Sequence, residues 1–254
     1  MEGKKTLLCH IINLDRSPER WEKIQANFSQ IPLTVRRISG IEVRSLDEPL
    51  PVPFLSVSFA LRMGRPAVPG EIGCYASHLK AMKEFLATDF DFCLICEDDV
   101  VPNADLMDVL RESLEIPGWD LLRAAKCREK GFQVWRKLPC GTAIGTNLKG
   151  FAFAAAYVVS RKGAEMLLKN LTPMQLPYDL ALFQGRLNVR EASLMPCPVS
   201  LAPGSEFSEI GERRKIRSLM LGFFRNIAQI GMRIRRYSVQ TIRILQRKRS
   251  RNTA

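Results

Sequence analysis

The chain has 254 residues, of which 46% are hydrophobic and 25% are charged. These values are ordinary for a soluble globular protein, and the length suits one large α/β domain, or about 200 residues plus an appendage. No window approaches about 18 consecutive apolar residues, so the sequence does not support a transmembrane helix. Seven scattered cysteines, an odd number, favour reduced thiols in the cytoplasm over a disulfide framework.

The net charge of +12 is unevenly placed along the chain. Residues 212–254 hold 13 Lys and Arg against one acid, so residues 1–211 are neutral with 25 basic and 25 acidic residues. The excess positive charge therefore belongs to a C-terminal tail.

The first unit is predicted to be strand, helix, strand. Residues 6–12 form an apolar run that is too short for a secretory signal and leads directly into the polar loop 13–16. Trp21, Ile24 and Phe28 then recur at helical spacing behind Pro18, and residues 33–38 read as a second strand. This order predicts parallel pairing of the two strands with a right-handed crossover.

Residues 41–69 contain five prolines and predict a long surface loop, of a length that is uncommon without a function. A helix is expected over residues 70–86, and Gly70 and Gly73 at its start would allow close approach of backbone. His78 is one of only two histidines. It has two interpretations, a hydrogen-bonded structural residue or part of a site.

An apolar run over residues 92–96 ends in Glu97, Asp98 and Asp99. The run predicts a buried strand, whose carboxyl end is where open α/β sheets bind ligands. Three adjacent carboxylates repel one another unless a cation such as Mg²⁺ or Mn²⁺ shares their charge. The sequence thus favours a site for a metal and a diphosphate, with a solvated acidic turn as the alternative.

Further along, we expect a short helix from residue 102 to 114, strands over 119–122 and 151–160, and a helix over 161–168. Residues 126–149 are basic, rich in glycine and irregular. Asp179 begins another helix, where it is either an N-cap or a functional acid.

Several of these stretches together resemble glycosyltransferase family 25, a family of bacterial lipooligosaccharide glycosyltransferases related to the collagen galactosyltransferases. The resemblance covers roughly residues 6–210. It rests on residues 12–20, on the run Gly70 to Leu79, on Glu97-Asp98-Asp99-Val100, on residues 156–160 and on Tyr178-Asp179.

The resemblance implies a GT-A fold, a Rossmann-like α/β/α sandwich with a mostly parallel central sheet, over residues 1–211. It also implies that an acidic motif holds a divalent cation, Mn²⁺ or Mg²⁺, on a UDP-sugar donor. Asp99 is the expected metal ligand, and Glu97 is a candidate for a second metal contact or for the ribose. By strand alternation, Asp98 is expected to point away and to anchor the loop.

Further roles follow from the resemblance by position. Asn13, Asp15 and Arg20 would hold the nucleoside, although Arg20 could equally be a surface charge. Glu71 and His78 would reach the donor sugar or phosphate. Asp179 is the first candidate for the general base of an inverting reaction, and Glu206 is the second.

Residues 212–254 are expected to form a basic amphipathic helix. Its apolar stripe includes Phe223, Ile227, Ile230 and Ile234, with arginines around the other faces. This composition suits a helix on an anionic membrane surface, and the alternative is a solvated basic tail. We therefore expect a cytoplasmic protein, peripheral on the bacterial inner membrane.

The expected activity is transfer of a hexose, galactose from UDP-galactose first, onto the core saccharide of a lipooligosaccharide or lipopolysaccharide on its lipid carrier. Two alternatives remain. One is a catalytically silent relative that binds a sugar nucleotide or a partner. The other, a nucleic-acid-binding protein, is disfavoured because no recognition module and few stacking aromatics accompany the basic tail, so no nucleic-acid partner is expected.

Overall fold

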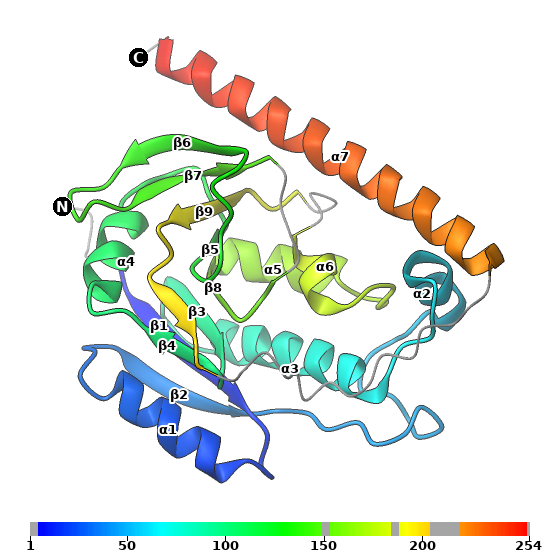
Figure 1. Cartoon of the computed structure of the whole chain (residues 1–254). Helices are drawn as coiled ribbons and strands as arrows, with labels where there is room; N and C mark the ends of the chain where they lie inside the picture. Colours follow the sequence, from blue (N-terminus) through cyan, green and yellow to red (C-terminus); the bar gives the residue numbers. More distant parts are fainter. Residues whose placement is uncertain (1–4, 149–152, 184–187, 204–218, 253–254) are drawn as a thin grey trace.

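The computed structural model describes residues 5–148, 153–183, 188–203 and 219–252, and eight strands in these ranges form one sheet (Figure 1). Its strand order is β2-β1-β3-β8-β5-β9-β7-β6. The bounds are β1 Leu7–Asn13, β2 Thr34–Ser39, β3 Phe92–Glu97, β5 Leu121–Arg123, β6 Phe132–Lys137, β7 Ala143–Asn147, β8 Ala156–Ser160 and β9 Glu191–Met195. A separate antiparallel pair joins β4 (Val100–Pro102) to β10 (Val199–Leu201).

The sheet is mixed, but most of its strands point one way. Strand β1 is parallel to both β2 and β3, and β5 is parallel to β9. Strands β8 and β7 run antiparallel to their neighbours, which leaves six of the eight described strands in a common direction. The prediction of a mostly parallel central sheet is confirmed.

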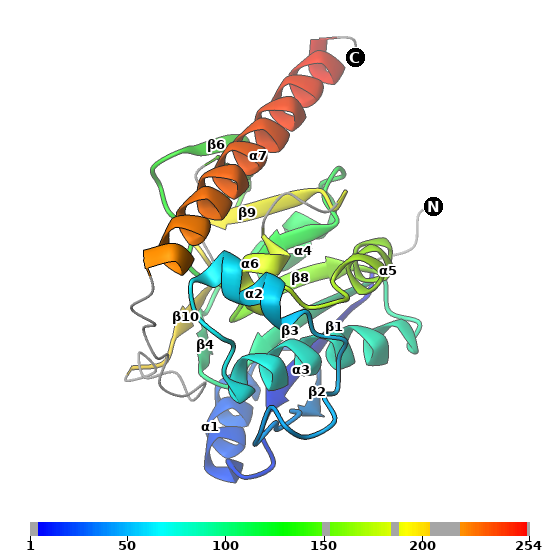
Figure 2. The ribbon, with the colours of Figure 1, turned by 90° about the vertical axis from the view of Figure 1, so that its right-hand side faces the viewer.

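Helices cover both faces of the sheet (Figures 1 and 2). One core packs α1 (Pro18–Phe28) and α4 (Leu106–Leu114) against the sheet, and the other packs α3 (Pro69–Leu86), α5 (Arg161–Asn170) and α6 (Tyr178–Leu182). Cys93 belongs to the second core and Cys96 to the first, so these two side chains lie on opposite faces. The α/β/α sandwich is therefore present.

The strand register brings the predicted site residues to one edge. In β1 and β3, Ile12 pairs with Glu97, so the loop after Asn13 lies beside the acidic turn. The loop after β1 thus lies at the same edge of the sheet as the acidic turn, and the parallel pairing predicted for the first two strands, β1 and β2, is confirmed.

Two regions are more regular than the sequence predicts. The proline-rich loop 41–69 contains helix α2 (Ser56–Met63), and residues 132–147 of the basic region form the hairpin β6–β7. The expectation of irregular structure there was wrong. Strand β6 lies at the sheet edge with an exposed and half-buried pattern, so the apolar signal that marks a buried strand is missing.

Helix α7 (Leu219–Asn252) crosses the outside of the domain from α2 towards β6 (Figure 1). Its polar face is turned inward: Arg236 Nη2 and Gln240 Nε2 lie 3.3 and 3.0 Å from Glu191 Oε2. The Arg247 guanidinium lies 3.7 Å from the centroid of the Trp135 ring. The predicted helix is confirmed, whereas the division at residue 212 stays a prediction.

The apolar stripe of α7 faces away from the domain. Each of five side chains is more than half exposed: Phe223, Ile227, Ile230, Ile234 and Tyr237. Among the described helices, none combines the length and the apolar character that crossing a bilayer requires.

Candidate active site

A cleft of about 1190 Å³ opens at the edge where β1 and β3 end. Its walls come from the loop after β1, the start of α3, the acidic turn after β3, and the start of α6. Six of the predicted site residues line it: Arg20, Glu71, His78, Glu97, Asp99 and Asp179. The volume exceeds that of most drug-sized ligand pockets and leaves room for a nucleotide sugar.

Asp98 is held in place by the loop after β1. Its carboxylate lies 2.5 Å from Arg20 Nη2 and accepts a hydrogen bond of 2.7 Å from Asn13 Nδ2. Asn13 Oδ1 in turn accepts from Arg37 Nε at 2.9 Å. Asn13 thus ties the acidic turn to β1 and β2, and Arg20 ties it to α1. Both contacts agree with the anchoring role expected of Asp98.

Asp99 differs from Asp98 in its hydrogen bonding. Its Oδ1 atom is buried and has no hydrogen-bond partner among the described residues. Burial and the nearby charge of Glu97 raise the pKa of Asp99 to about 7, against the opposing charge of Arg20, whose Nη2 lies 3.9 Å from Asp99 Oδ2. An unsatisfied carboxylate oxygen beside a second carboxylate fits a hard divalent cation.

Strand β3 ends at Glu97, and Asp98 and Asp99 form a turn. The strand alternation that placed Glu97 and Asp99 on one face therefore does not extend to Asp99. All three acids line the cleft, and the partners of Asp98 separate its role from that of Asp99.

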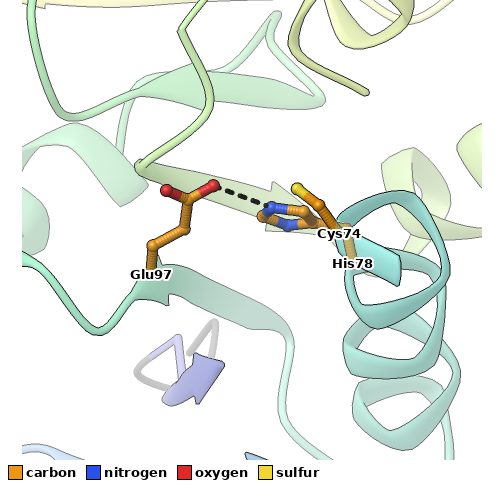
Figure 3. A group of neighbouring side chains, drawn as sticks. All are labelled: Cys74, His78 and Glu97. Carbon is orange, nitrogen blue, oxygen red and sulfur yellow. Dashed lines mark hydrogen bonds and ion pairs between the residues drawn. The ribbon is translucent and has the colours of Figure 1, made fainter. Parts of the chain in front are cut away.

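His78 is positioned by an aromatic cluster. Its ring is stacked on Tyr178 with centroids 4.0 Å apart, and its Nδ1 lies 3.1 Å from Tyr157 Oη. The Nε2 atom lies 3.3 Å from Glu97 Oε1 and faces the cleft residues, with the Cys74 thiol beside it (Figure 3). Both earlier interpretations of His78 apply, because the ring is hydrogen-bonded and also belongs to the cleft.

Glu71 has a structural partner that the sequence did not indicate. Its carboxylate forms two hydrogen bonds with Arg65, of 2.8 and 2.6 Å, and accepts a third from the Val68 amide. Glu71 is buried, and its hydrogen bond from the Val68 amide caps the first turn of α3. A direct contact with the donor stays a prediction, and the structure accounts for the carboxylate without one.

Asp15 lies outside the described lining of the cleft. Its carboxylate accepts a hydrogen bond of 2.6 Å from Ser39 Oγ and pairs with Arg37 at 2.9 Å. The Ser39 hydrogen bond, helped by the Arg37 charge, lowers the pKa of Asp15. Like Asn13, Asp15 organises the loop, and its predicted contact with the nucleoside is without support from the geometry.

Asp179 stands in the first turn of α6 and lines the cleft. The N-cap of that helix is Pro177, so the interpretation of Asp179 as the cap was wrong. Its Oδ1 accepts a hydrogen bond of 2.7 Å from the Leu180 amide. Glu206, the second candidate base, lies outside the described residues.

The cleft residues that were not predicted include Cys74, Arg44 and Lys126. Cys74 and His78 stand four residues apart on α3, a spacing that places side chains on one face of a helix and could have indicated the pair. Arg44 and Lys126 come from stretches with no periodic pattern. Only the folded chain brings them to the cleft.

Gly73, near the start of α3, lets this helix pack closely against the loop at Ile41. A Cβ on Gly73 would lie 2.5 Å from the Ile41 carbonyl oxygen, so only glycine allows this approach. The Ile41 amide donates a 2.7 Å hydrogen bond to Ser77 Oγ. The prediction of a close backbone approach is confirmed, and the partner is the loop that carries Arg44.

The fold and the cleft together define a mixed α/β protein with an acidic, ligand-sized cleft at the carboxyl edge of its sheet. The family description "Glycosyltransferase family 25 (LPS biosynthesis protein)" matches residues 7–182. The chain belongs to this glycosyltransferase family.

Curated relatives share a limited part of the chain. A "Glycosyltransferase 25 family member" of Aedes aegypti is 28% identical over 63% of this chain and 27% of its own length. "Procollagen galactosyltransferase 2" of Homo sapiens is 22% identical over 82% of this chain and 33% of its own. A "Probable inactive glycosyltransferase 25 family member 3" of Bos taurus is 26% identical over 66% and 30%, so the chain spans a third or less of these proteins.

Solved structures with partial similarity include two glycosyltransferases. The galactosyltransferase LgtC, solved with donor and acceptor sugar analogues, has a TM-score of 0.41 and 13% identity over 87% of this chain and 95% of its own. A glycosyltransferase involved in glycosylation of the major capsid of PBCV-1 has a TM-score of 0.41 and 8% identity over 89% and 99%.

Proposed function

We propose that the protein transfers a hexose from a UDP-sugar to a saccharide acceptor, with help from a divalent cation. Family membership supports glycosyl transfer. The metal-assisted form rests on the buried Oδ1 of Asp99, which has no hydrogen-bond partner in the part of the chain that the structure describes. Because Asp98 is neutralised by Arg20, the turn presents Asp99 and Glu97 as the two carboxylates for the cation.

The chain's own residues prepare the cleft for a diphosphate. Arg44, Lys23 and Lys126 line it and bring positive charge to the rim of an acidic turn. Their charges attract a phosphorylated donor, while Asp99 and Glu97 would hold Mn²⁺ or Mg²⁺. When bound, such a cation would screen the diphosphate and stabilise the charge on departing UDP.

Asp179 is the proposed general base. It would remove the proton from the acceptor hydroxyl while that oxygen attacks the anomeric carbon on the face opposite UDP, with inversion. The position of Asp179 supports this role. Asp179 lines the cleft at the start of α6, next to Tyr178, whose ring is stacked on His78. Glu206 stays the second candidate.

For the donor we propose UDP-galactose, and for the acceptor a lipooligosaccharide or lipopolysaccharide core saccharide on a lipid carrier. The similarity to a human procollagen galactosyltransferase supports galactose, and the family description names LPS biosynthesis. Small contacts in a pocket are enough to change which hexose is selected.

A screen of UDP-sugars for metal-dependent hydrolysis tests the proposal without knowledge of the acceptor. We expect UDP release from UDP-galactose with Mn²⁺ or Mg²⁺, and none after chelation. UDP-glucose and UDP-N-acetylhexosamines serve as the comparison. Metal-independent hydrolysis, or preference for another sugar, would contradict the metal role or the donor respectively.

A silent relative that only binds nucleotide sugars is the second candidate, because relatives described as inactive are among the similar proteins. Calorimetry separates the two. Tight binding of UDP-galactose without hydrolysis, and without transfer to any saccharide acceptor, would favour the silent relative.

We also propose that α7 rests on an anionic membrane surface, at the cytoplasmic face of the inner membrane. The outward stripe supplies the apolar contact, and the exposed Arg233 and Arg235 flank it. Each basic residue near anionic lipid contributes about 1 kcal/mol. The inward contacts of Arg236, Gln240 and Arg247 would keep the domain attached to this surface.

Replacing Ile230 and Ile234 together by Ser is expected to weaken binding to vesicles that contain phosphatidylglycerol, because it removes two exposed apolar side chains from the stripe. Co-sedimentation measures the binding, and UDP-sugar hydrolysis should stay unchanged. Val57→Ser, which alters an exposed apolar residue on α2, is the matched control and should bind normally. Equal sedimentation of all three proteins would refute the membrane role of the stripe.

A further inference from the structure

We propose that Cys74, His78 and Glu97 form a zinc site in the wall of the cleft, distinct from the Asp99 carboxylate. Their ligand atoms, the Cys74 thiol sulfur, a His78 ring nitrogen and a Glu97 carboxylate oxygen, all lie within 4.8 Å of one another. In a tetrahedral zinc site, ligand atoms lie about 3.5 Å apart. Shifts of the order of 1 Å would therefore close the three residues around an ion.

The backbone already presents the three ligands to one point. Cys74 and His78 are one turn apart on α3, and Glu97 reaches towards them from the end of β3 (Figure 3). His78 Nε2 and Glu97 Oε1 are 3.3 Å apart, close to the spacing of two zinc ligands. One helix and one strand of the rigid core hold the whole set.

The surroundings of His78 suit a metal ligand. Its ring is fixed by the stacked Tyr178 ring, with an interplanar angle of 2°, and its Nδ1 lies 3.1 Å from Tyr157 Oη. When Nδ1–H donates to Tyr157, the lone pair of Nε2 points at Glu97. Histidine ligands of metals characteristically donate their other ring N–H in this way.

The ligand types select the ion. A thiolate, an imidazole and a carboxylate suit Zn²⁺, whereas Mg²⁺ and Mn²⁺ prefer oxygen ligands. Three protein ligands also leave a fourth position for water or a phosphate oxygen. Asp99 offers only oxygen, so the cleft contains two cation sites of different preference that share Glu97.

Cobalt is the spectroscopic probe for this site, because Co²⁺ replaces Zn²⁺ in tetrahedral sites and reports bound thiolate by a charge-transfer band in the near ultraviolet. We expect the full-length, metal-free protein to show this band with Co²⁺ and to lose it when Zn²⁺ is added. Cys74→Ser should remove the band, and Tyr157→Phe should weaken cobalt binding roughly tenfold.

Two control variants isolate the site. Cys127→Ser alters a thiol that lies by a separate, smaller cavity together with Cys197, and it should keep the band. Asp99→Asn should keep the band as well, because Asp99 is not a ligand of the zinc site. A band that survives in Cys74→Ser, or that never forms with the unaltered protein, would overturn the proposal.

Alkylation of the unaltered protein tests the same claim without a variant that must fold. Zn²⁺ should protect Cys74 from iodoacetamide, measured by mass spectrometry of its peptide, whereas Mg²⁺ should not. Equal modification with both ions would refute the site.

One consequence rests on the proposed function. Since Glu97 serves both sites, Zn²⁺ should inhibit UDP-sugar hydrolysis in the presence of Mn²⁺, and Cys74→Ser should relieve the inhibition. If the chain hydrolyses no UDP-sugar, the proposed function fails while the cobalt band and the alkylation still decide the zinc site.

Discussion

Replacing Asp99 by Asn should reduce metal-dependent UDP-sugar hydrolysis by roughly a hundredfold or more, the loss expected when a main electrostatic stabiliser of a transition state is removed. The amide keeps the size of the side chain and cannot take a negative charge, so it would hold a divalent cation poorly. Initial rates of UDP release across a Mn²⁺ titration measure the effect. Hydrolysis at the unaltered rate would remove Asp99 from the metal site.

The same variant should be more stable than the unaltered protein at high pH. The pKa of Asp99 is raised from 3.8 to about 7 in the folded protein, so between these values the folded state holds a proton that the unfolded state has lost. Stability therefore falls as the pH rises through this range, and the cost is complete above pH 7. At about 1.4 kcal/mol for each pKa unit, the cost reaches a few kcal/mol.

Thermal unfolding with a chelator present checks this prediction. Asp99→Asn should melt higher than the unaltered protein at about pH 8, and the difference should vanish towards about pH 4, where Asp99 is neutral in both states. Asp98→Asn is the matched control from the same turn. It loses the pairing with Arg20 and should not be stabilised at high pH.

The raised pKa of Asp99 also predicts how pH affects metal activation. A proton and a cation compete for the same carboxylate, so the apparent affinity for Mg²⁺ should fall as the pH drops below about 7. Metal titrations of UDP-sugar hydrolysis at several pH values measure this shift. An affinity independent of pH would contradict the assignment of Asp99 as the ligand.

Removing Arg65 should destabilise the protein by roughly 3–5 kcal/mol, because Arg65→Ala leaves the buried Glu71 carboxylate without its cation. The pair is nearly enclosed, with the two side chains 11% and 1% exposed. Chemical denaturation measures the free energy of unfolding. The exposed pair Arg111–Asp108, with 4.0 Å between its charged atoms, supplies the control, and Arg111→Ala should cost less than about 1 kcal/mol.

A double variant decides between the two roles of Glu71. If the carboxylate serves the fold, replacing Arg65 and Glu71 together by Leu should restore most of the stability, because no buried charge is left unpaired. Binding of UDP-galactose to this stable double variant would place Glu71 outside donor recognition. Restored stability with lost binding would instead support the donor contact predicted from the sequence.

Much of the site's framework could be predicted because it depends on short-range patterns. The apolar run before Glu97 is a buried strand, because a strand covered on both faces is apolar throughout. Trp21, Ile24 and Phe28 belong to a helix, because their spacing follows the period of about 3.6 residues. The edge strand β6 was not predicted, because it buries no continuous face.

The sequence by itself determined that this is an α/β protein of glycosyltransferase family 25, with an acidic turn at a strand end and a basic amphipathic helix at its C-terminal side. Only the tertiary structure decided which acid is available to a cation. Asp98 and Asp99 are adjacent and chemically identical. They differ because Asn13 donates to Asp98, and because Arg20 Nη2 lies 2.5 Å from Asp98 Oδ1 but 3.9 Å from Asp99 Oδ2. Likewise, Arg65 forms an ion pair with Glu71, and the packing of α3 against β3 brings Cys74 and His78 close to Glu97. A charge in a folded protein acquires its role from its partners, and these partners are set by long-range packing that no local pattern encodes.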